Sequence, residues 1–200
     1  LGQLHQLHLR FRHDIFSMDF KELYKSYLRK LDSLKLRRTN HVILASIKNQ
    51  KLFLIKDNQI VNEFRMSTSK NKPSCINASL GTPWGLHEIC EKIGDNEPFG
   101  MVFVGRKATG KIFSECTAEK QLGNLITTRI LRLKGLEPGI NSGGSVDSFD
   151  RYIYIHGTNH EERLGLPASS GCLQMSNDDI IEIYNVILEN THIWIENPFV

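Results

Sequence analysis

The sequence predicts a mainly β domain accompanied by two helices. After His41, short runs rich in Val, Ile, Leu and Phe follow one another between turn residues, as in a chain of hairpins. Only two stretches, near the start and near the end, place apolar residues at helical spacing. The composition, 40% hydrophobic and 24% charged, is that of a globular protein, and 200 residues can bury a sizeable core.

The first helix is predicted over residues 16–34. Ser17 and Asp19 are suitable caps at its start, and a basic, polar connector follows over residues 35–40. We therefore divide the chain into an N-terminal helical segment with its connector, residues 1–40, and a β domain, residues 41–200. The helix either docks on the side of the domain or belongs to a region that precedes it. The apolar residues that define it are Phe16, Phe20, Leu23, Tyr24, Tyr27, Leu28, Leu31 and Leu34.

The β domain opens with three strands joined by hairpin turns at Asn49-Gln50 and Asp57-Asn58-Gln59. A loop-rich stretch is predicted next, because Pro73, the Gly- and Pro-containing residues 81–85 and Pro98 all disfavour regular structure. The predicted strands of the whole domain are residues 41–48, 51–56, 60–68, 100–105, 125–133, 151–156 and 191–196.

The second helix is predicted to begin at Ser176, because Asp179 lies three residues after this Ser cap. Ile180, Ile183 and Tyr184 contribute to its apolar face. The helix is expected to stop at residues 189–190. Together these elements predict a mostly antiparallel β domain with one helix before it and one near its end.

Charge and cysteine usage exclude several classes of protein. A net charge of +3 and a pI near 8.7 suit contact with an anionic polymer but are too weak to indicate nucleic-acid binding. The apolar runs are too short to cross a membrane. Cys75, Cys90, Cys116 and Cys172 show no CxxC spacing, which argues against a zinc site and against a disulfide scaffold, although one bridge among the first three is possible. The chain starts at Leu1 without a leader pattern, so we expect a fragment from which any export signal has been removed.

Cys172 and His156 are the candidate catalytic pair. Cys172 follows the small residues Ser169, Ser170 and Gly171, which allow a substrate backbone to approach and a turn to aim N–H groups at one point. His156 ends an apolar strand sixteen residues earlier, and a histidine is the usual group that activates a cysteine thiol. The pair predicts a cysteine acyltransferase.

Two other interpretations of these residues stay open. His156 is equally consistent with a structural histidine that hydrogen-bonds the backbone. His156, His160 and Cys172 also form a possible metal ligand set, although the sequence between the two histidines lacks the HExxH helix of a zinc protease.

The segments His156-Gly157-Thr158-Asn159 and Leu164–Met175, with the predicted helix behind them, resemble the L,D-transpeptidase catalytic domain family of the YkuD type. Residues 51–56 and the turn Gly81-Thr82-Pro83-Trp84-Gly85 are also similar to that family, and the likeness covers about residues 41 to 196. The resemblance implies a β-rich sandwich or barrel-like domain that acts on peptidoglycan stem peptides without a metal or cofactor. It makes Cys172 the nucleophile, His156 the general base and acid, and Gly157 the carbonyl that orients His156.

The same resemblance implies that Gly171, Ser169, Ser170 and Gln174 contact the oxyanion or the substrate. The chain departs from the family pattern at two of them, because the family usually has histidine where Ser170 stands and often arginine where Gln174 stands. The first departure places more of the activation on His156, and the second replaces a cation by a neutral amide. Trp84 and His87 are interpreted as structural residues, and Arg129, Arg132 and Arg151 as solvated surface residues.

The expected activity is therefore a peptidoglycan L,D-transpeptidase of the bacterial cell envelope, periplasmic or secreted, with no nucleic-acid partner. Hydrolysis of the same thioester would instead give an L,D-carboxypeptidase. A non-catalytic peptidoglycan-binding module, inactivated by Ser170 and Gln174, is the alternative from a different class of protein.

Overall fold

The computed structural model describes residues 20–199 of the chain. The chain divides into two compact units, Leu1–Arg38 and Thr39–Val200. In the first unit, a helix covers residues 20–34, as the apolar spacing predicts. Its Leu23, Tyr27 and Leu31 are buried, and they recur every four residues along one face. The predicted caps Ser17 and Asp19 lie outside the described residues.

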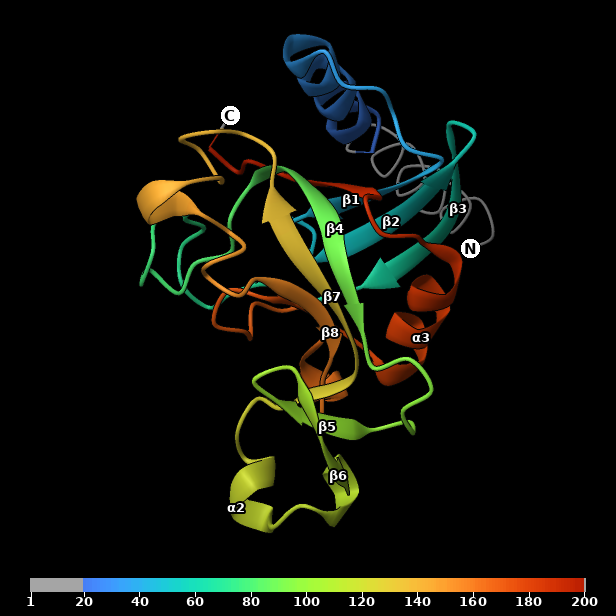
Figure 1. Ribbon diagram of the computed structural model, residues 1–200, viewed down its shortest axis with the longest axis vertical. Helices are drawn as coiled ribbons and strands as arrows, with labels where there is room; N and C mark the ends of the chain where they lie inside the picture. The colour runs from blue at the N-terminus through green and yellow to red at the C-terminus, as the bar shows by residue number, and fades with distance from the viewer. Residues whose placement is uncertain (1–19, 200) are drawn as a thin grey trace, which may run out of the picture. The chain divides into compact units, whose positions relative to one another are not determined.

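The second unit is built on a ten-stranded mixed sheet (Figure 1). Its main path runs in the order β3-β2-β1-β10-β4-β7-β5-β6, and β8 joins it by pairing with β7 on one side and with β9 on the other. The strands are β1 (His41–Ser46), β2 (Lys51–Lys56), β3 (Gln59–Arg65), β4 (Gly85–Ile93), β5 (Met101–Val104), β6 (Lys107–Ile112), β7 (Ile126–Gly135), β8 (Tyr154–Gly157), β9 (Leu173–Met175) and β10 (His192–Ile195). The helices are α2 (Ala118–Gln121) and α3 (Asn177–Val186), with 3₁₀ turns at Phe113–Glu115, Gly144–Val146 and Glu161–Arg163.

The predicted opening hairpins are confirmed. β1 pairs antiparallel with β2, and β2 pairs antiparallel with β3. Asp57 and Asn58 both have positive φ, 50° and 65°, which is the conformation that a two-residue turn between twisted strands requires. Gln50 also has a positive φ of 51°.

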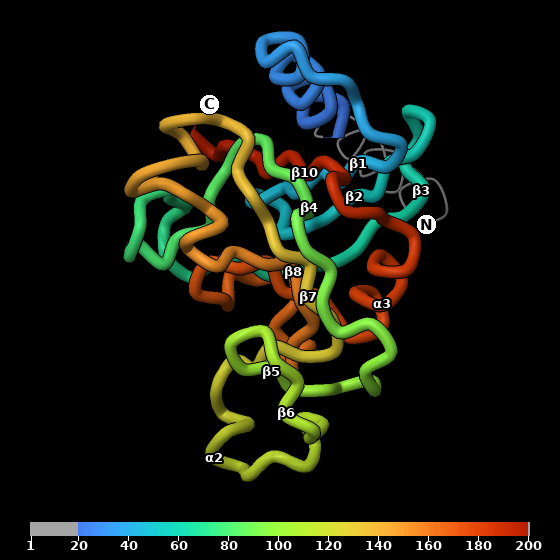
Figure 2. The backbone as a smooth tube through the Cα atoms, in the orientation of Figure 1, coloured from blue at the N-terminus to red at the C-terminus, as the bar shows by residue number. Residues whose placement is uncertain are grey.

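The prediction of a mostly antiparallel sheet needs a correction, because two strand pairs are parallel. β10 runs parallel to β1 and antiparallel to β4, so the last strand enters the sheet between two earlier ones (Figure 2). β9 runs parallel to β8, and this pair carries the two candidate catalytic residues to neighbouring positions.

The prediction of loop between Pro73 and Pro98 is wrong, because β4 occupies residues 85–93 at the centre of the sheet between β10 and β7. Its sequence, GLHEICEKI, interrupts its apolar residues with His87, Glu88, Glu91 and Lys92 and contains only two β-branched residues, Ile89 and Ile93, so its strand signal is weak. Pairing on both edges, rather than local propensity, holds it in place. β6, β9 and α2 were also not predicted.

The predicted strand over residues 151–156 begins three residues later than expected. Tyr152 has a φ of 56° and lies outside the strand, which starts at Tyr154.

The sheet curls until its ends meet near β9. Ser67, just beyond β3, forms an antiparallel bridge with Gln174, in which each residue donates its N–H to the other's carbonyl oxygen, at 2.9 and 2.8 Å. The enclosed core combines side chains from both sides of this closure, among them Met66, Leu131 and Leu173. This closure sets the strand that follows Cys172 against the start of the domain.

Helix α3 packs beside the sheet, and its predicted cap is confirmed. The Ser176 hydroxyl accepts the N–H of Asp179 at 3.1 Å. The helix ends at Val186, earlier than predicted, because Ile187 adopts an extended conformation and is fully buried. Within residues 20–199, no helix is both long and apolar enough to cross a membrane.

Candidate active site

The turn that presents Cys172 is held by Ser169. The Ser169 hydroxyl donates to the carbonyl oxygen of Cys172 at 2.6 Å and accepts the N–H of Gly171 at 3.2 Å. Gly171 has a φ of 128°, and a Cβ atom there would lie 3.6 Å from the Gly81 carbonyl oxygen. The small-residue turn predicted from the sequence is therefore packed against residues 80–81, directly before the Thr-Pro-Trp-Gly segment.

The Cys172 thiol is partly buried and protonated. Its sulfur donates to the Tyr152 carbonyl oxygen at 3.5 Å. Burial raises the pKa of Cys172 to about 11, opposed by a hydrogen bond from the backbone at Tyr154 and by the charge of Arg151. The resting thiol is therefore not ionised at neutral pH.

His156 is held as a neutral imidazole with a defined tautomer. Its Nδ1 lies 2.7 Å from the Gly157 carbonyl oxygen, which can only accept, so Nδ1 carries the proton and Nε2 keeps its lone pair. Burial lowers the pKa of His156 to about 4. The ring is thus a proton acceptor at neutral pH, and its geometry agrees with the carbonyl contact expected from Gly157.

Gly157 is fixed by the first residue of α3. A Cβ atom at Gly157 would lie 2.7 Å from Oδ1 of Asn177 and 2.8 Å from the carbonyl oxygen of Thr127, so only glycine fits. Asn177 is buried, accepts from the hydroxyls of Thr127 and Thr128, and donates to the Thr158 carbonyl oxygen at 2.9 Å. This network holds the backbone that orients His156.

A pocket of about 190 Å³ brings the predicted residues together. His156 and Cys172 share it with three of the predicted substrate residues, and no charged side chain is among its lining. In the described part of the chain no hydrogen bond joins Cys172 to His156, since the thiol is turned toward Tyr152. The lining residues are Asn124, Ile126, His156, Ser169, Ser170, Cys172 and Gln174.

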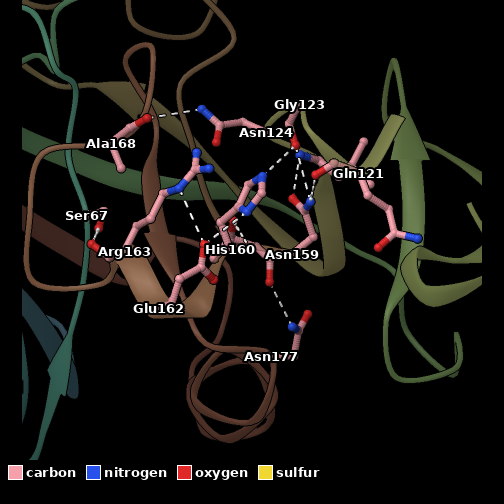
Figure 3. Close-up of polar contacts among 12 residues, drawn as sticks. Ser67, Gln121, Gly123, Asn124, Asn159, His160, Glu162, Arg163, Ala168 and Asn177 are labelled. Atoms are coloured by element: carbon pink, nitrogen blue, oxygen red, sulfur yellow. Dashed lines mark hydrogen bonds and ion pairs between the residues drawn. The ribbon is translucent and has the colours of Figure 1, made fainter. Parts of the chain in front are cut away.

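Two pocket residues, Asn124 and Ile126, were not identified from the sequence. They flank Leu125 in a segment that contacts with other loops hold in place. The Asn159 side-chain oxygen accepts the N–H of Leu125 at 2.9 Å, and the Asn124 side chain donates to the Ala168 carbonyl oxygen at 3.0 Å (Figure 3). These contacts join residues more than thirty positions apart in the chain, so no local sequence pattern predicts them.

The metal interpretation of His156, His160 and Cys172 fails on geometry. His160 is not part of the pocket; its ring nitrogens lie 3.1 Å from the Glu162 carboxylate and 3.1 Å from the Gly123 carbonyl oxygen (Figure 3). Among residues 20–199, no group of three or more His, Cys, Asp or Glu side chains gathers as metal ligands would. All four cysteines are free, so the open possibility of a bridge is not realised.

The prediction that Arg129, Arg132 and Arg151 are solvated surface residues is wrong. Arg132 is buried, stacks on Phe149 and forms an ion pair with Glu91 at 3.0 Å. Arg129 and Arg151 are partly buried and donate to backbone carbonyl oxygens. None of the three lines the pocket.

His87 is confirmed as a structural side chain. It is fully buried, and its Nε2 lies 2.9 Å from the Ser148 hydroxyl. Burial lowers its pKa to about 4. Trp84 makes an edge contact with Phe199 at 5.4 Å between ring centroids, away from the pocket.

The depressed pKa values of His87 and His156 predict a loss of stability in mild acid. The unfolded chain, with histidines at the ordinary 6.5, binds protons below that pH, whereas the folded rings stay neutral down to about 4. Stability present above pH 6.5 is thus lost as the pH falls toward 4, by on the order of 3 kcal/mol for each ring. Urea unfolding between pH 7.5 and 4.5 measures this, and His87→Gln should reduce the slope without abolishing it, because burial also lowers the pKa values of His156 and His192. A free energy of unfolding that is flat over this range would contradict the assignment.

The sequence matches one known protein family. The profile of the YkuD family, described as the L,D-transpeptidase catalytic domain, matches residues 40–195. YqjB of Bacillus subtilis (strain 168), a protein named as an L,D-transpeptidase, is 43% identical over 47 residues, which are 23% of this chain and 27% of YqjB.

An L,D-transpeptidase from Mycobacterium smegmatis superposes with a TM-score of 0.47 at 16% identity, covering 79% of this chain and 59% of that one. L,D-transpeptidase 3 from Mycobacterium tuberculosis, solved with a faropenem-derived adduct, has a TM-score of 0.49 at 14% identity, covering 79% and 60%. The chain thus spans about a quarter of YqjB and about three fifths of these structures. The family match extends over most of the sequence, and the chain belongs to the YkuD family of L,D-transpeptidase catalytic domains.

Proposed function

We propose that the protein is a peptidoglycan L,D-transpeptidase of the bacterial cell envelope that uses Cys172 as its nucleophile. The observation that carries the proposal is the shared pocket of Cys172 and His156, in which the proton on Nδ1 is tied to the Gly157 carbonyl oxygen. This leaves Nε2 as the acceptor for the thiol proton. Membership of the family supports stem peptides as the substrate class.

The reaction starts from a neutral pair. Because the pKa of Cys172 is raised to about 11 and that of His156 is lowered to about 4, the proton moves as the sulfur attacks rather than beforehand. The thiol first turns from the Tyr152 carbonyl oxygen toward Nε2 of His156. The sulfur then bonds to the carbonyl carbon of the third stem residue while Nε2 takes the proton.

The remaining steps return that proton. The amide bond to the terminal D-alanine breaks, and the D-alanine nitrogen takes the proton from His156. Free D-alanine departs, and the donor peptide stays bound to Cys172 as a thioester. An acceptor amine then attacks the thioester carbonyl and loses a proton to His156. The bond between carbon and sulfur breaks, and His156 passes the proton to the sulfur, which restores the thiol. A 3→3 crosslink is the product when the amine belongs to a second stem peptide.

The oxyanion of the tetrahedral intermediate needs N–H donors from the cysteine turn. The Gly171 N–H is engaged by the Ser169 hydroxyl at 3.2 Å. We therefore assign the principal donor role to the Cys172 N–H, with Gly171 contributing only when the Ser169 hydroxyl shifts. Ser169 also keeps the turn closed, through its bond to the Cys172 carbonyl oxygen.

Gln174 is proposed to contact the substrate. Its side chain is 3% exposed, lines the pocket and makes no hydrogen bond with another described residue. A buried amide with free donors and an acceptor favours a neutral polar group, whereas a carboxylate in this uncharged pocket would lack a partner. Ser170 lies exposed at the rim and leaves room for the donor peptide.

A substrate contact by Gln174 predicts a preference among donor peptides that Gln174→Arg should reverse. Two tetrapeptide donors, identical except that the side-chain carboxylate of the third residue is free or amidated, are compared by the rate of D-alanine release. We expect the amidated donor to react faster, and Gln174→Arg to shift the ratio toward the free carboxylate by about tenfold. Gln59→Arg, which adds the same charge at an exposed residue that does not line the pocket, should leave the ratio unchanged. An unaltered ratio in Gln174→Arg would remove Gln174 from the substrate contact.

Product analysis tests the function itself. Purified disaccharide-tetrapeptides are incubated with the protein, and the products are identified by mass spectrometry. A 3→3 dimer is the expected result. Tripeptide without dimer would show that water is the acceptor and the protein an L,D-carboxypeptidase, whereas unchanged substrate with retained binding to peptidoglycan would indicate a non-catalytic module.

A further inference from the structure

Arg151 carries a positive charge that no carboxylate in the described part of the chain neutralises. Its guanidinium is partly buried and donates to neutral acceptors only, the carbonyl oxygens of Ser74 at 3.0 Å and Gly81 at 2.7 Å and the hydroxyl of Ser79 at 3.3 Å. A partly buried guanidinium usually has an acidic partner. Burial lowers the pKa of Arg151, and the nearby Cys75 and Cys172 oppose that change.

Two sets of contacts place the Arg151 guanidinium near the turn that carries Cys172. The Gly81 carbonyl oxygen, to which Arg151 donates, lies 3.6 Å from the position of a Cβ atom on Gly171, the residue before the nucleophile. Along the chain, Arg151 directly precedes Tyr152, whose left-handed backbone aims its carbonyl oxygen at the Cys172 sulfur. Arg151 therefore joins the two segments that enclose the thiol.

We propose that Arg151 is a positioning residue whose unpaired charge stabilises the developing thiolate of Cys172 while its guanidinium holds residues 74–81 against the cysteine turn. The catalytic relevance of this role rests on the proposed function. A cation at this place compensates in part for the histidine that the family usually has where Ser170 stands. The energetic reason is that a charge in a partly dry site is weakly screened and favours a nearby anion.

The other titratable groups near the thiol do not supply that charge. His156 is neutral, because burial lowers its pKa to about 4. The Tyr154 phenol has a raised pKa, chiefly through burial, and accepts a hydrogen bond from Arg106 at 3.2 Å. Cys75 is buried beside Arg151 and its pKa is also raised by burial. Arg151 is the cation whose charge acts on Cys172 and lowers its pKa.

The experiment compares Arg151→Lys with Arg151→Gln. Both variants lose the forked contacts to Ser74 and Gly81, but only the lysine keeps the charge. The readout is the rate at which iodoacetamide alkylates Cys172 between pH 7 and 9, followed by mass spectrometry of the peptide that contains it. Below the thiol pKa this rate is proportional to the thiolate fraction. Cys90 in the same samples is the internal reference.

We expect Cys172 in Arg151→Gln to react about three- to tenfold more slowly than in Arg151→Lys, with Cys90 unchanged. Equal rates in the two variants would overturn the proposal, since a purely structural role is lost in both. Arg129→Met, which removes another partly buried arginine bound to carbonyl oxygens, should leave the Cys172 rate unaltered.

A second pair of variants leaves Arg151 in place, so that the proposal can be tested even if the Arg151 variants do not fold. Ser79→Asp places a carboxylate next to the guanidinium, and Ser79→Asn is its neutral counterpart. The aspartate should slow alkylation of Cys172 relative to the asparagine, and equal rates would again contradict the proposal. Failure of the proposed function would look different: the unmodified protein would form no acyl adduct, while these alkylation ratios would stand.

Discussion

Cys172→Ala is expected to abolish covalent acylation of the protein by imipenem, a carbapenem, and to abolish turnover of stem peptides. The reason is that the sulfur forms the bond to the acyl carbon, so no other group in the pocket can replace it. Intact-mass measurement after incubation with imipenem should show one adduct on the unmodified protein and none on the variant.

Cys90→Ala is the matched control for this prediction. Cys90 is also partly buried, and burial raises its pKa to about 11, as for Cys172. Its sulfur donates to a backbone carbonyl oxygen, that of Arg132, at 3.4 Å, but it does not line the pocket with His156. An adduct that persists in Cys172→Ala and disappears in Cys90→Ala would place the reactive thiol elsewhere.

His156→Ala is expected to slow acylation by imipenem about 10²- to 10⁴-fold, the usual contribution of a general base. The neutral thiol of Cys172 depends on a proton acceptor, and the Nε2 atom of His156 is the one that the pocket offers. Rapid-quench kinetics followed by mass spectrometry gives the rate constants.

Ser170→Ala provides the comparison for His156→Ala, because Ser170 lines the same pocket but lies exposed. Its removal should change the acylation rate by less than about threefold. Equal and small effects of the two variants would contradict the assignment of His156 as the base. His156→Gln, which retains polarity without a comparable base, should behave like the alanine variant.

The parts of the fold that local chemistry determines could be predicted from the sequence. The turn at Asp57-Asn58 and the cap at Ser176 each rest on residues adjacent in the chain, and both appear as expected. β4 could not be predicted in this way, because its mixed sequence becomes a strand only through pairing with β10 and β7. The start of β8 was predicted too early, because residues 149–152 form a turn in which the Tyr152 N–H donates to the Phe149 carbonyl oxygen at 3.1 Å and Tyr152 has a positive φ.

The candidate site shows the same division. Cys172, His156 and their small neighbours form a pattern along the chain, and the structure brings them to one pocket through the parallel pairing of β8 and β9. Asn124 reaches the rim through the contacts of Asn159 and Ala168, which no sequence pattern reveals. Arg151 was interpreted as a surface residue because its neutral partners come from a loop seventy residues away.

The apolar face of the N-terminal helix could be predicted from the sequence. The apolar positions Leu23, Tyr27 and Leu31 are buried, in agreement with the predicted amphipathic pattern. The lining residues of the pocket belong to the unit Thr39–Val200.

The most direct test of the account is to capture the acyl-enzyme. The protein is incubated with a disaccharide-tetrapeptide donor, quenched in acid and examined by mass spectrometry while free D-alanine is measured in parallel. We predict a mass increase equal to the donor minus D-alanine, located on the peptide that contains Cys172, with D-alanine released at least in equal amount. An acyl group on any other residue, or D-alanine release that persists in Cys172→Ala, would contradict the account.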